Sequence, residues 1–310
     1  MRALVTGGAG FIGSNIVDGL LAEGHDVAVI DTLTTGKRSN LPDTAVLHEV
    51  DVADAAAVNR VVAAERPDVI FHLAAHIDVR VSVTDPRHDA DINVGGTINV
   101  LTAAAEHGVR RVVLSSTGGA IYGDTELVPS GEHTPIAPLA PYGQSKFAAE
   151  GYCALFTRLH GLSTIALRYA NVYGPRQDPL GEGGVVAIFC GCLANGTTPR
   201  VFGDGLQTRD YVFVGDVVRA NLLAAASDVT EPLNIGSGVE TTVLELADAL
   251  RPLGDGKHPF VPVHEPERAG EVRRSALDAR RAGELLGWRA DTGLGDGLRI
   301  TLAHVADGGR

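Results

Sequence analysis

The chain has 310 residues, of which 45% are hydrophobic and 21% charged, a balance that excludes disordered and collagen-like chains and is ordinary for a soluble α/β protein. At ~150 residues per domain, this length is sufficient for two lobes with cores of their own. The formal net charge of −12 argues against a nucleic acid or an anionic membrane as partner, because either would need a basic face.

The chain begins with a predicted strand, a glycine-rich turn and a helix. Residues 3–6 are mostly apolar and follow directly on the first two residues, so we expect no signal peptide and a cytoplasmic protein. Gly7, Gly10 and Gly13 come next, and a helical run ends at Gly24. Glycines between a strand and a helix permit a tight turn and bring the backbone close to a pyrophosphate at the helix N-terminus.

The second predicted strand, residues 26–31, ends in an acid. A carboxylate at Asp31 would accept hydrogen bonds from the adenosine ribose and would repel a 2′-phosphate. The sequence therefore favours NAD over NADP, although Lys37 and Arg38 lie nearby.

Strands predicted at 45–50, 68–73 and 111–116 alternate with helices at 54–65 and 91–107. This alternation is typical of α/β proteins with a Rossmann-type, doubly wound parallel sheet, which binds ligands at the carboxyl ends of its strands. Asp51 and Val52 are then placed at the adenine, and residues 73–75 (Leu73, Ala74, Ala75) at the pyrophosphate and ribose, although such small residues also serve packing alone. His72 and His76 flank a buried strand and are expected to be structural.

Hydroxyl side chains end the strand at 111–116, and a helix with a tyrosine and a lysine follows. Ser115, Ser116 and Thr117 would face the same crevice as Tyr142. A helix is predicted to begin at Pro141, and Tyr142 and Lys146 share one face of it, being four residues apart. The ammonium would stabilise the phenolate and lower the phenol pKa from ~10, which gives a base at neutral pH.

The second half of the chain holds fewer chemical signals. Residues 185–192 form the longest apolar run, far short of the ~20 needed to cross a bilayer. Cys190 and Cys192 are expected in a core, and no metal site is expected, because no further Cys or His has ligand spacing. Thr242 is predicted to cap a helix that runs to residue 250. Trp288 and the C-terminal residues that follow it are expected to have a structural and not a chemical role.

Taken together in this order, four motifs resemble those of the extended short-chain dehydrogenase/reductases. They are TGGAGFIG at 6–13, the hydroxyl-bearing strand end at 115–117, Tyr142-x-x-x-Lys146, and RYANVYGP at 168–175. GPRQDP at 174–179 with GVVAIF at 184–189 resembles the UDP-glucose 4-epimerase group most. The resemblance covers nearly the whole chain.

The resemblance implies an isomerase that inverts C4 of a UDP-hexose with tightly bound NAD, UDP-glucose and UDP-galactose being the first pair. Tyr142 would take the proton of the 4-hydroxyl while C4 gives a hydride to NAD, and the hydride would return to the other face of the turned 4-keto sugar. Lys146 would hold the nicotinamide ribose and lower the pKa of Tyr142. Thr117 would be the catalytic hydroxyl, with Ser116 as the alternative, because Gly118 and Gly119 lengthen this segment by one residue.

The resemblance also implies the binding residues. The cofactor would contact Gly7, Gly10, Phe11, Ile12, Gly13, Asp31, Asp51, Val52, Leu73, Ala74, Ala75, Asn93, Ser115, Tyr142, Lys146 and Tyr169. On the substrate side, Asn171, Arg209 and Arg268 would meet the diphosphate, Phe202 the uracil and Glu271 the uridine ribose. Thr117, Val185, Arg176 and Ser275 would face the sugar, where a small Ser275 would admit an N-acetyl group and Arg176 would bind a carboxylate.

UDP-N-acetylglucosamine and UDP-glucuronate 4-epimerases therefore remain alternatives. A dehydratase or decarboxylase would need an acid pair where Gly118 and Gly119 stand, and a non-catalytic NAD-binding regulator would lack the tyrosine or the lysine. An NAD-binding domain is expected over 1–170 with about 211–239, and a nucleotide-sugar-binding lobe over about 171–210 and 240–310. The resemblance further implies a homodimer through a helix pair that includes residues 145–160.

Overall fold

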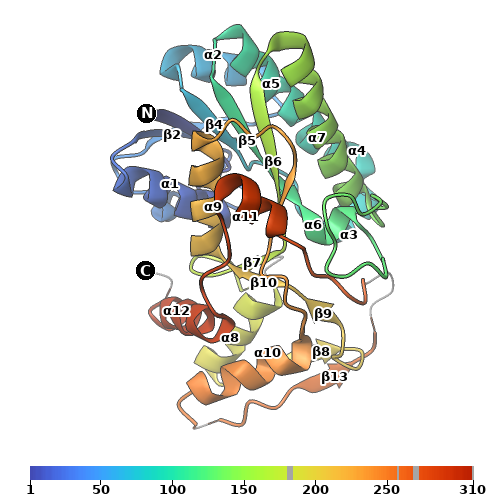
Figure 1. Ribbon diagram of the computed structural model, residues 1–310. Helices are drawn as coiled ribbons and strands as arrows, with labels where there is room; N and C mark the ends of the chain where they lie inside the picture. Colours follow the sequence, from blue (N-terminus) through green and yellow to red (C-terminus); the bar gives the residue numbers. More distant parts are fainter. Residues whose placement is uncertain (180–183, 257, 268–271, 309–310) are drawn as a thin grey trace.

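A seven-stranded, all-parallel sheet organises the chain. The computed structural model describes residues 1–179, 184–256, 258–267 and 272–308 (Figure 1). The strand order is β11-β6-β5-β4-β1-β2-β3. The strands are β1 (Arg2–Thr6), β2 (Asp26–Asp31), β3 (Val46–Glu49), β4 (Val69–His72), β5 (Arg111–Thr117), β6 (Ser163–Tyr169) and β11 (Leu233–Ile235). The predicted doubly wound parallel sheet is confirmed.

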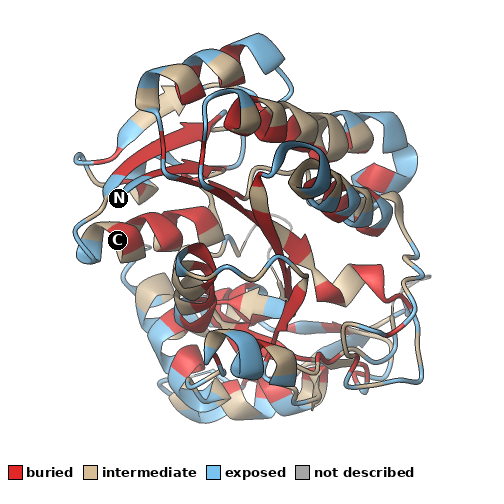
Figure 2. Ribbon diagram, turned by 45° about the horizontal axis from the view of Figure 1, so that its top comes forward, coloured by how far each residue is buried: buried red, intermediate tan, exposed pale blue. Residues whose placement is uncertain are grey.

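Helices cover both faces of this sheet, so its central strands are buried, whereas the edge strand β3 is partly exposed (Figure 2). Alternate residues of one strand serve opposite faces: Ala3 and Val5 pack into one core and Leu4 into the other. The first core is closed by α1 (Phe11–Ala22), α9 (Val214–Ala226) and α11 (Arg280–Leu286), and the second by α2 (Ala55–Glu65), α5 (Gly96–Glu106) and α7 (Pro141–His160). Continuous apolar strands follow from this burial on two sides.

The helix boundaries follow local signals in the sequence. α7 begins with Pro141 in its first turn and ends at Gly161, which is left-handed (φ 67°). The predicted helix at 91–107 differs: a π-helical turn, Asp91–Gly95, joins α4 (Pro86–Ala90) to α5. The remaining short helices of this half are η1 (Arg38–Asn40), α3 (Val79–Thr84) and α6 (Gly118–Ile121).

A second lobe lies below the sheet in Figure 1 and has its own core, which includes Tyr173, Phe189, Leu246 and Leu298. Three two-stranded sheets pair β7 with β10, β8 with β13 and β9 with β12. Its elements are β7 (Asn171–Tyr173), α8 (Val185–Asn195), β8 (Arg200–Phe202), β9 (Thr208–Arg209), β10 (Tyr211–Phe213), β12 (Thr241–Thr242), α10 (Val243–Leu250), η3 (Arg251–Leu253), β13 (Val263–Glu265) and α12 (Leu294–Ala306). Thr242 caps α10 in a capping box with Glu245, as predicted.

The chain passes repeatedly between the sheet and the second lobe. β11 returns to pair with β6, and Trp288 is buried where its indole donates to the Asp216 carbonyl (2.9 Å). Cys153 and Cys190 are buried and, like Cys192, are free thiols. Among the described residues, none of the helices combines the length and the apolar character that a bilayer span requires, and no metal-binding group of His, Cys, Asp or Glu is found.

Candidate active site

The glycine-rich turn forms a backbone cradle at the N-terminus of α1. A Cβ atom on Gly13 would lie 2.1 Å from the Gly7 carbonyl oxygen, so a side chain there would push the two segments apart. Gly10 caps the helix without a side-chain hydrogen bond. The helix N-terminus, flanked by the partly buried Phe11 and Ile12, is therefore left to the backbone and suits a phosphate group.

Asp31 closes this cradle at the end of β2. Its carboxylate accepts from the amides of Ala9 (2.9 Å) and Leu33 (2.8 Å), one at each oxygen. Because a carboxylate oxygen has a second lone pair, both oxygens keep capacity for ribose hydroxyls. The cradle and this acid fit an adenine dinucleotide, as the sequence predicts.

The ends of β3 and β4 complete the edge of this cleft. Asp51 is exposed, whereas Val52 is buried against Gly96 of α5. The amides of Leu73 and Ala74 donate to the Thr6 hydroxyl (3.2 and 3.1 Å), and Ala75 is partly exposed beside them. These residues lie at the carboxyl ends of the strands, where the sequence places them.

The His72 imidazole supports this edge from within. Its nitrogens contact the hydroxyls of Thr6 (2.7 Å) and Thr97 (3.1 Å), and burial lowers its pKa to about 3. His72 is therefore neutral and structural, as predicted.

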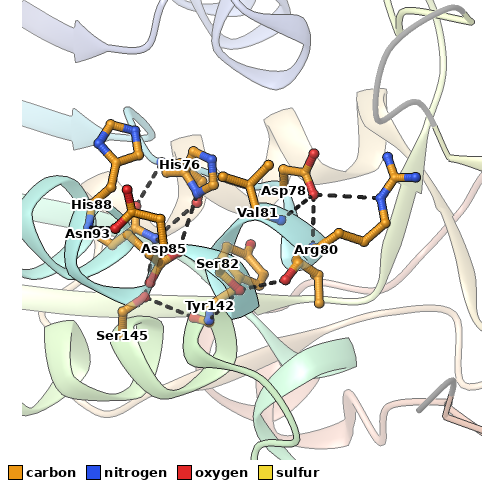
Figure 3. A network of polar contacts seen from close by, with 12 residues as sticks. His76, Asp78, Arg80, Val81, Ser82, Asp85, His88, Asn93, Tyr142 and Ser145 are labelled. Carbon is orange, nitrogen blue, oxygen red and sulfur yellow. Dashed lines mark hydrogen bonds and ion pairs between the residues drawn. The ribbon is translucent and has the colours of Figure 1, made fainter. Parts of the chain in front are cut away.

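Tyr142 and Lys146 lie on the first turns of α7, against the end of β5. The Lys146 ammonium donates to the Ser115 carbonyl (2.9 Å). The Tyr142 amide donates to the Ser82 hydroxyl (3.3 Å) (Figure 3). The Thr117 side chain, at the end of β5, acts on the Tyr142 phenol and lowers its pKa. The predicted tyrosine, lysine and strand-end hydroxyl thus come together.

Ser116 has a different role from Thr117. Its hydroxyl donates to Glu150 of α7 (2.5 Å), and this carboxylate is also paired with Arg168 of β6 (2.7 Å). Ser116, predicted as catalytic, is therefore committed to a buried network, and Thr117 stays the predicted hydroxyl of the site.

The charges of the site bear on the ionisation of the tyrosine and the lysine. Burial, and after it the Asp89 carboxylate, raise the pKa of Tyr142 to about 12, and the nearby Thr117 side chain opposes them only in part. Burial also lowers the pKa of Lys146 to about 8, while Asp89 and Glu150 act against that change. Desolvation dominates the pKa of Tyr142 and the Lys146 ammonium binds the Ser115 carbonyl, so the lowering of the tyrosine pKa by Lys146 stays a prediction.

Two residues predicted to contact the cofactor, Asn93 and Tyr169, have protein partners in the structure. The Asn93 amide donates to the His76 carbonyl (2.9 Å), Asp89 (3.0 Å) and Ser145 (3.1 Å). The Tyr169 hydroxyl is hydrogen-bonded to Asn221 within the first core. Both side chains are buried and have protein partners, so they support the site from behind.

Arg176, predicted to face the sugar, is turned toward the dinucleotide domain. Its backbone is left-handed (φ 71°), and its guanidinium forms an ion pair with Asp18 of α1. The preceding carbonyl, of Pro175, accepts from Asn15 of the same helix (3.2 Å). The loop after β7 is thereby held on α1, and the carboxylate-binding role of Arg176 stays a prediction.

The segment that begins at residue 272 reaches the end of β5 from the second lobe. Arg209 donates to the carbonyl of Val272 (2.8 Å), and the buried carboxylate of Asp210 accepts from the Leu277 amide (3.1 Å). A Cβ atom on Gly118 would lie 2.5 Å from Leu277, so glycine is needed where this segment packs. Ser275 lies on this segment and is partly buried.

The other predicted substrate residues occupy the second lobe or its border with the sheet. Asn171 is exposed, and its side-chain oxygen would lie 3.8 Å from a Cβ atom on Gly119; Val185 and Phe202 are partly buried. The predictions for Arg268 and Glu271 fall outside the described residues.

Sequence reasoning missed two buried carboxylates of the site, Glu150 and Asp89. Glu150 follows Lys146 by four residues on one helical face, a signal that could have been used. Asp89 has no such signal, because it reaches the site only through the packing of α4 on α7.

Comparison with known proteins agrees with this geometry. The model of the NAD dependent epimerase/dehydratase family matches residues 3–236. The UDP-glucose 4-epimerase of Mycolicibacterium smegmatis is 46% identical over 308 residues, 97% of each chain. Solved structures of the UDP-glucose 4-epimerases of Thermotoga maritima, with UDP-glucose, and Thermus thermophilus, with NAD, are 44% and 42% identical, with TM-scores of 0.96 and 0.92 and coverage of 99% and 98% of each chain.

Proposed function

The chain belongs to the NAD-dependent epimerase/dehydratase family, and from this premise we propose that it interconverts UDP-glucose and UDP-galactose by inverting C4 of the hexose. The observation that carries the proposal is the position of Tyr142 and Lys146 on the first turns of α7, against the end of β5, where Lys146 donates to the Ser115 carbonyl (2.9 Å) at the edge of a cradle that fits NAD. Gly118 and Gly119 follow Thr117, so the acid pair that would eliminate water is missing at that place.

NAD, when bound, supplies the acceptor and donor of the hydride. Tyr142 removes the proton of the 4-hydroxyl as the hydride leaves C4, which gives a 4-keto sugar. After the sugar has turned over, Tyr142 returns the proton to the C4 oxygen as the hydride enters the opposite face, so nothing is oxidised overall. Thr117 orients the phenol and the sugar hydroxyl, and Lys146, with one of its three donors on Ser115, holds the nicotinamide ribose with the others.

Nucleotide-sugar recognition belongs, in this proposal, to the second lobe. Residues 1–170 with about 211–239 bind NAD, and about 171–210 with 240–310 bind the UDP-sugar. Asn171, Val185, Phe202, Arg209 and Ser275 are the contacts we assign there among the described residues. Since Arg176 is committed to Asp18, nothing in its placement favours a uronate.

A substrate panel tests the reaction. Purified protein is incubated separately with UDP-galactose, UDP-N-acetylgalactosamine and UDP-galacturonate, without added acceptor, and the products are separated by chromatography. We expect UDP-galactose to give UDP-glucose at the highest kcat/KM, with no accumulation of NADH. Stoichiometric NADH, or no conversion of UDP-galactose, would overturn the proposal.

We also propose a homodimer in which α7 of each subunit packs on its partner. Phe147, Gly151 and Ala154 are exposed on one side of this helix at spacings of four and three residues, which makes a narrow, mostly apolar stripe. Light scattering after gel filtration should give the mass of a dimer for the wild-type chain and of a monomer for Phe147→Asp. Ile300→Asp, on the exposed side of α12, is the matched control and should remain dimeric. A wild-type monomer at micromolar concentration would contradict the proposal.

A further inference from the structure

Asp89 is a buried carboxylate that its surroundings do not satisfy. It is fully buried on α4, and its Oδ1 accepts from Asn93 (3.0 Å) and lies 3.5 Å from the His76 imidazole. Its Oδ2 has no hydrogen-bond partner among the described residues. Leaving a buried charged acceptor unpaired is costly, so a purely structural carboxylate would be expected to have more donors.

Another buried acid in the same chain, Asp210, shows a carboxylate whose two oxygens both have hydrogen-bond donors. Asp210 accepts four hydrogen bonds, from the amide and hydroxyl of Ser237 and from the amides of Gly238 and Leu277. It joins the second lobe to the loop after β11 and leaves neither oxygen without a donor. Asp89 differs from it in having one oxygen free, next to the catalytic helix.

Asp89 is connected to the catalytic helix in two steps. Asn93 donates to Asp89 and also to the Ser145 hydroxyl (3.1 Å), which in turn donates to the Tyr142 carbonyl (3.0 Å) (Figure 3). α4 packs directly on α7, and the Asp89 charge acts on both Tyr142 and Lys146. The carboxylate raises both pKa values, which stabilises the charged form of Lys146 and the neutral form of Tyr142.

The other charged groups around Asp89 are either more exposed or already paired. Arg87 and Asp91 pair on the outer surface (2.7 Å), where solvent screens them. The remaining titratable groups on the neighbouring elements are His76 and Asp78 from the strand-end loop, Arg80 from α3, Asp85 and His88 from α4 and its N-cap, and Glu150 from α7.

We propose that Asp89 is a positioning residue for the reaction, whose buried charge sets where on the pH scale the two ionisations at the site, those of Tyr142 and Lys146, take place. This inference rests on the proposed function for its kinetic consequence, though not for its electrostatic one. Without the carboxylate, the phenolate forms more easily and the ammonium loses its proton more easily. Both changes move the working range in one direction, toward lower pH.

The test is the pH dependence of kcat/KM for Asp89→Asn, which keeps the shape and removes the charge. We expect both limbs of the profile to move to lower pH by about 1. If the maximum of kcat/KM falls while the pH midpoints of both limbs stay unchanged, Asp89 has a merely structural role and the proposal is overturned. Asp91→Asn, on the adjoining turn but at the surface, is the matched control and should leave both limbs unmoved.

A second measurement needs no turnover. Tyrosinate absorbance is titrated in Asp89→Asn, and the same titration in Asp89→Asn with Tyr142→Phe is subtracted, so that only the Tyr142 phenol is followed. Its midpoint should fall below that of the wild-type phenol, even for a protein that fails the substrate panel; an unchanged or higher midpoint would overturn the inference. If Asp89→Asn does not fold, Asp89→Ser, which removes the charge and the unpaired oxygen, must shift the same midpoint downward.

Discussion

Replacing Tyr142 with phenylalanine is expected to reduce kcat for UDP-galactose by a factor of ~10²–10⁴ while NAD remains bound. The phenol is the proposed base at the end of β5, and general acid–base catalysis by one positioned side chain contributes about this much. The glycine cradle and Asp31 are untouched by the change, so cofactor content should not fall. Initial rates and the NAD released on denaturation measure the two quantities.

A matched control for this variant lies further along the same helix. Tyr152 is partly buried against the second core, away from the strand-end hydroxyls, and Tyr152→Phe should keep near wild-type kcat. If Tyr142→Phe turned over as fast as Tyr152→Phe, the base would have to be another residue, and the mechanism proposed here would be wrong.

Removing Glu150 is expected to lower the free energy of unfolding by about 3–5 kcal/mol, the range found when one partner of a buried ion pair is deleted. In Glu150→Ala the Arg168 guanidinium would stay buried without its carboxylate, although Tyr122 still accepts one of its hydrogen bonds (2.9 Å). The hydroxyl of Ser116 would lose its acceptor as well. Urea unfolding monitored by circular dichroism gives the free energy.

An exposed ion pair provides the comparison for this loss. Arg299 and Asp296 form a pair on α12 whose side chains are both more than half exposed, and Arg299→Ala should cost only about 0–1 kcal/mol. The double variant Glu150→Leu with Arg168→Met should recover much of the stability, because a well-packed apolar pair carries no desolvation cost. A Glu150→Ala protein as stable as Arg299→Ala would show that the buried pair does not hold β5, β6 and α7 together.

Much of the fold could be predicted because it is encoded by short patterns. The strand–glycine–helix unit at the N-terminus and the helix cap at Thr242 depend on residues close together in the chain. The spacing of Tyr142 and Lys146 is likewise local, since one helix carries both. Such features can be predicted without knowing which residues pack around them.

The tertiary structure decided the roles that depend on burial and on distant partners. Ser116 and Thr117 are neighbours in sequence, yet only the position of Glu150 on α7 shows which hydroxyl is committed elsewhere. Arg176 was assigned to the sugar by its motif, but its left-handed backbone and the nearby Asp18 turn it to α1.

By itself, then, the sequence determined the parallel sheet, the cradle for a dinucleotide and the identity of the tyrosine and the lysine, because periodicity, turn residues and helical spacing are properties of contiguous residues. It could not determine the ionisation of Tyr142. That depends on desolvation and on Asp89, a carboxylate far away in the chain, and both arise only when the helices pack on the sheet.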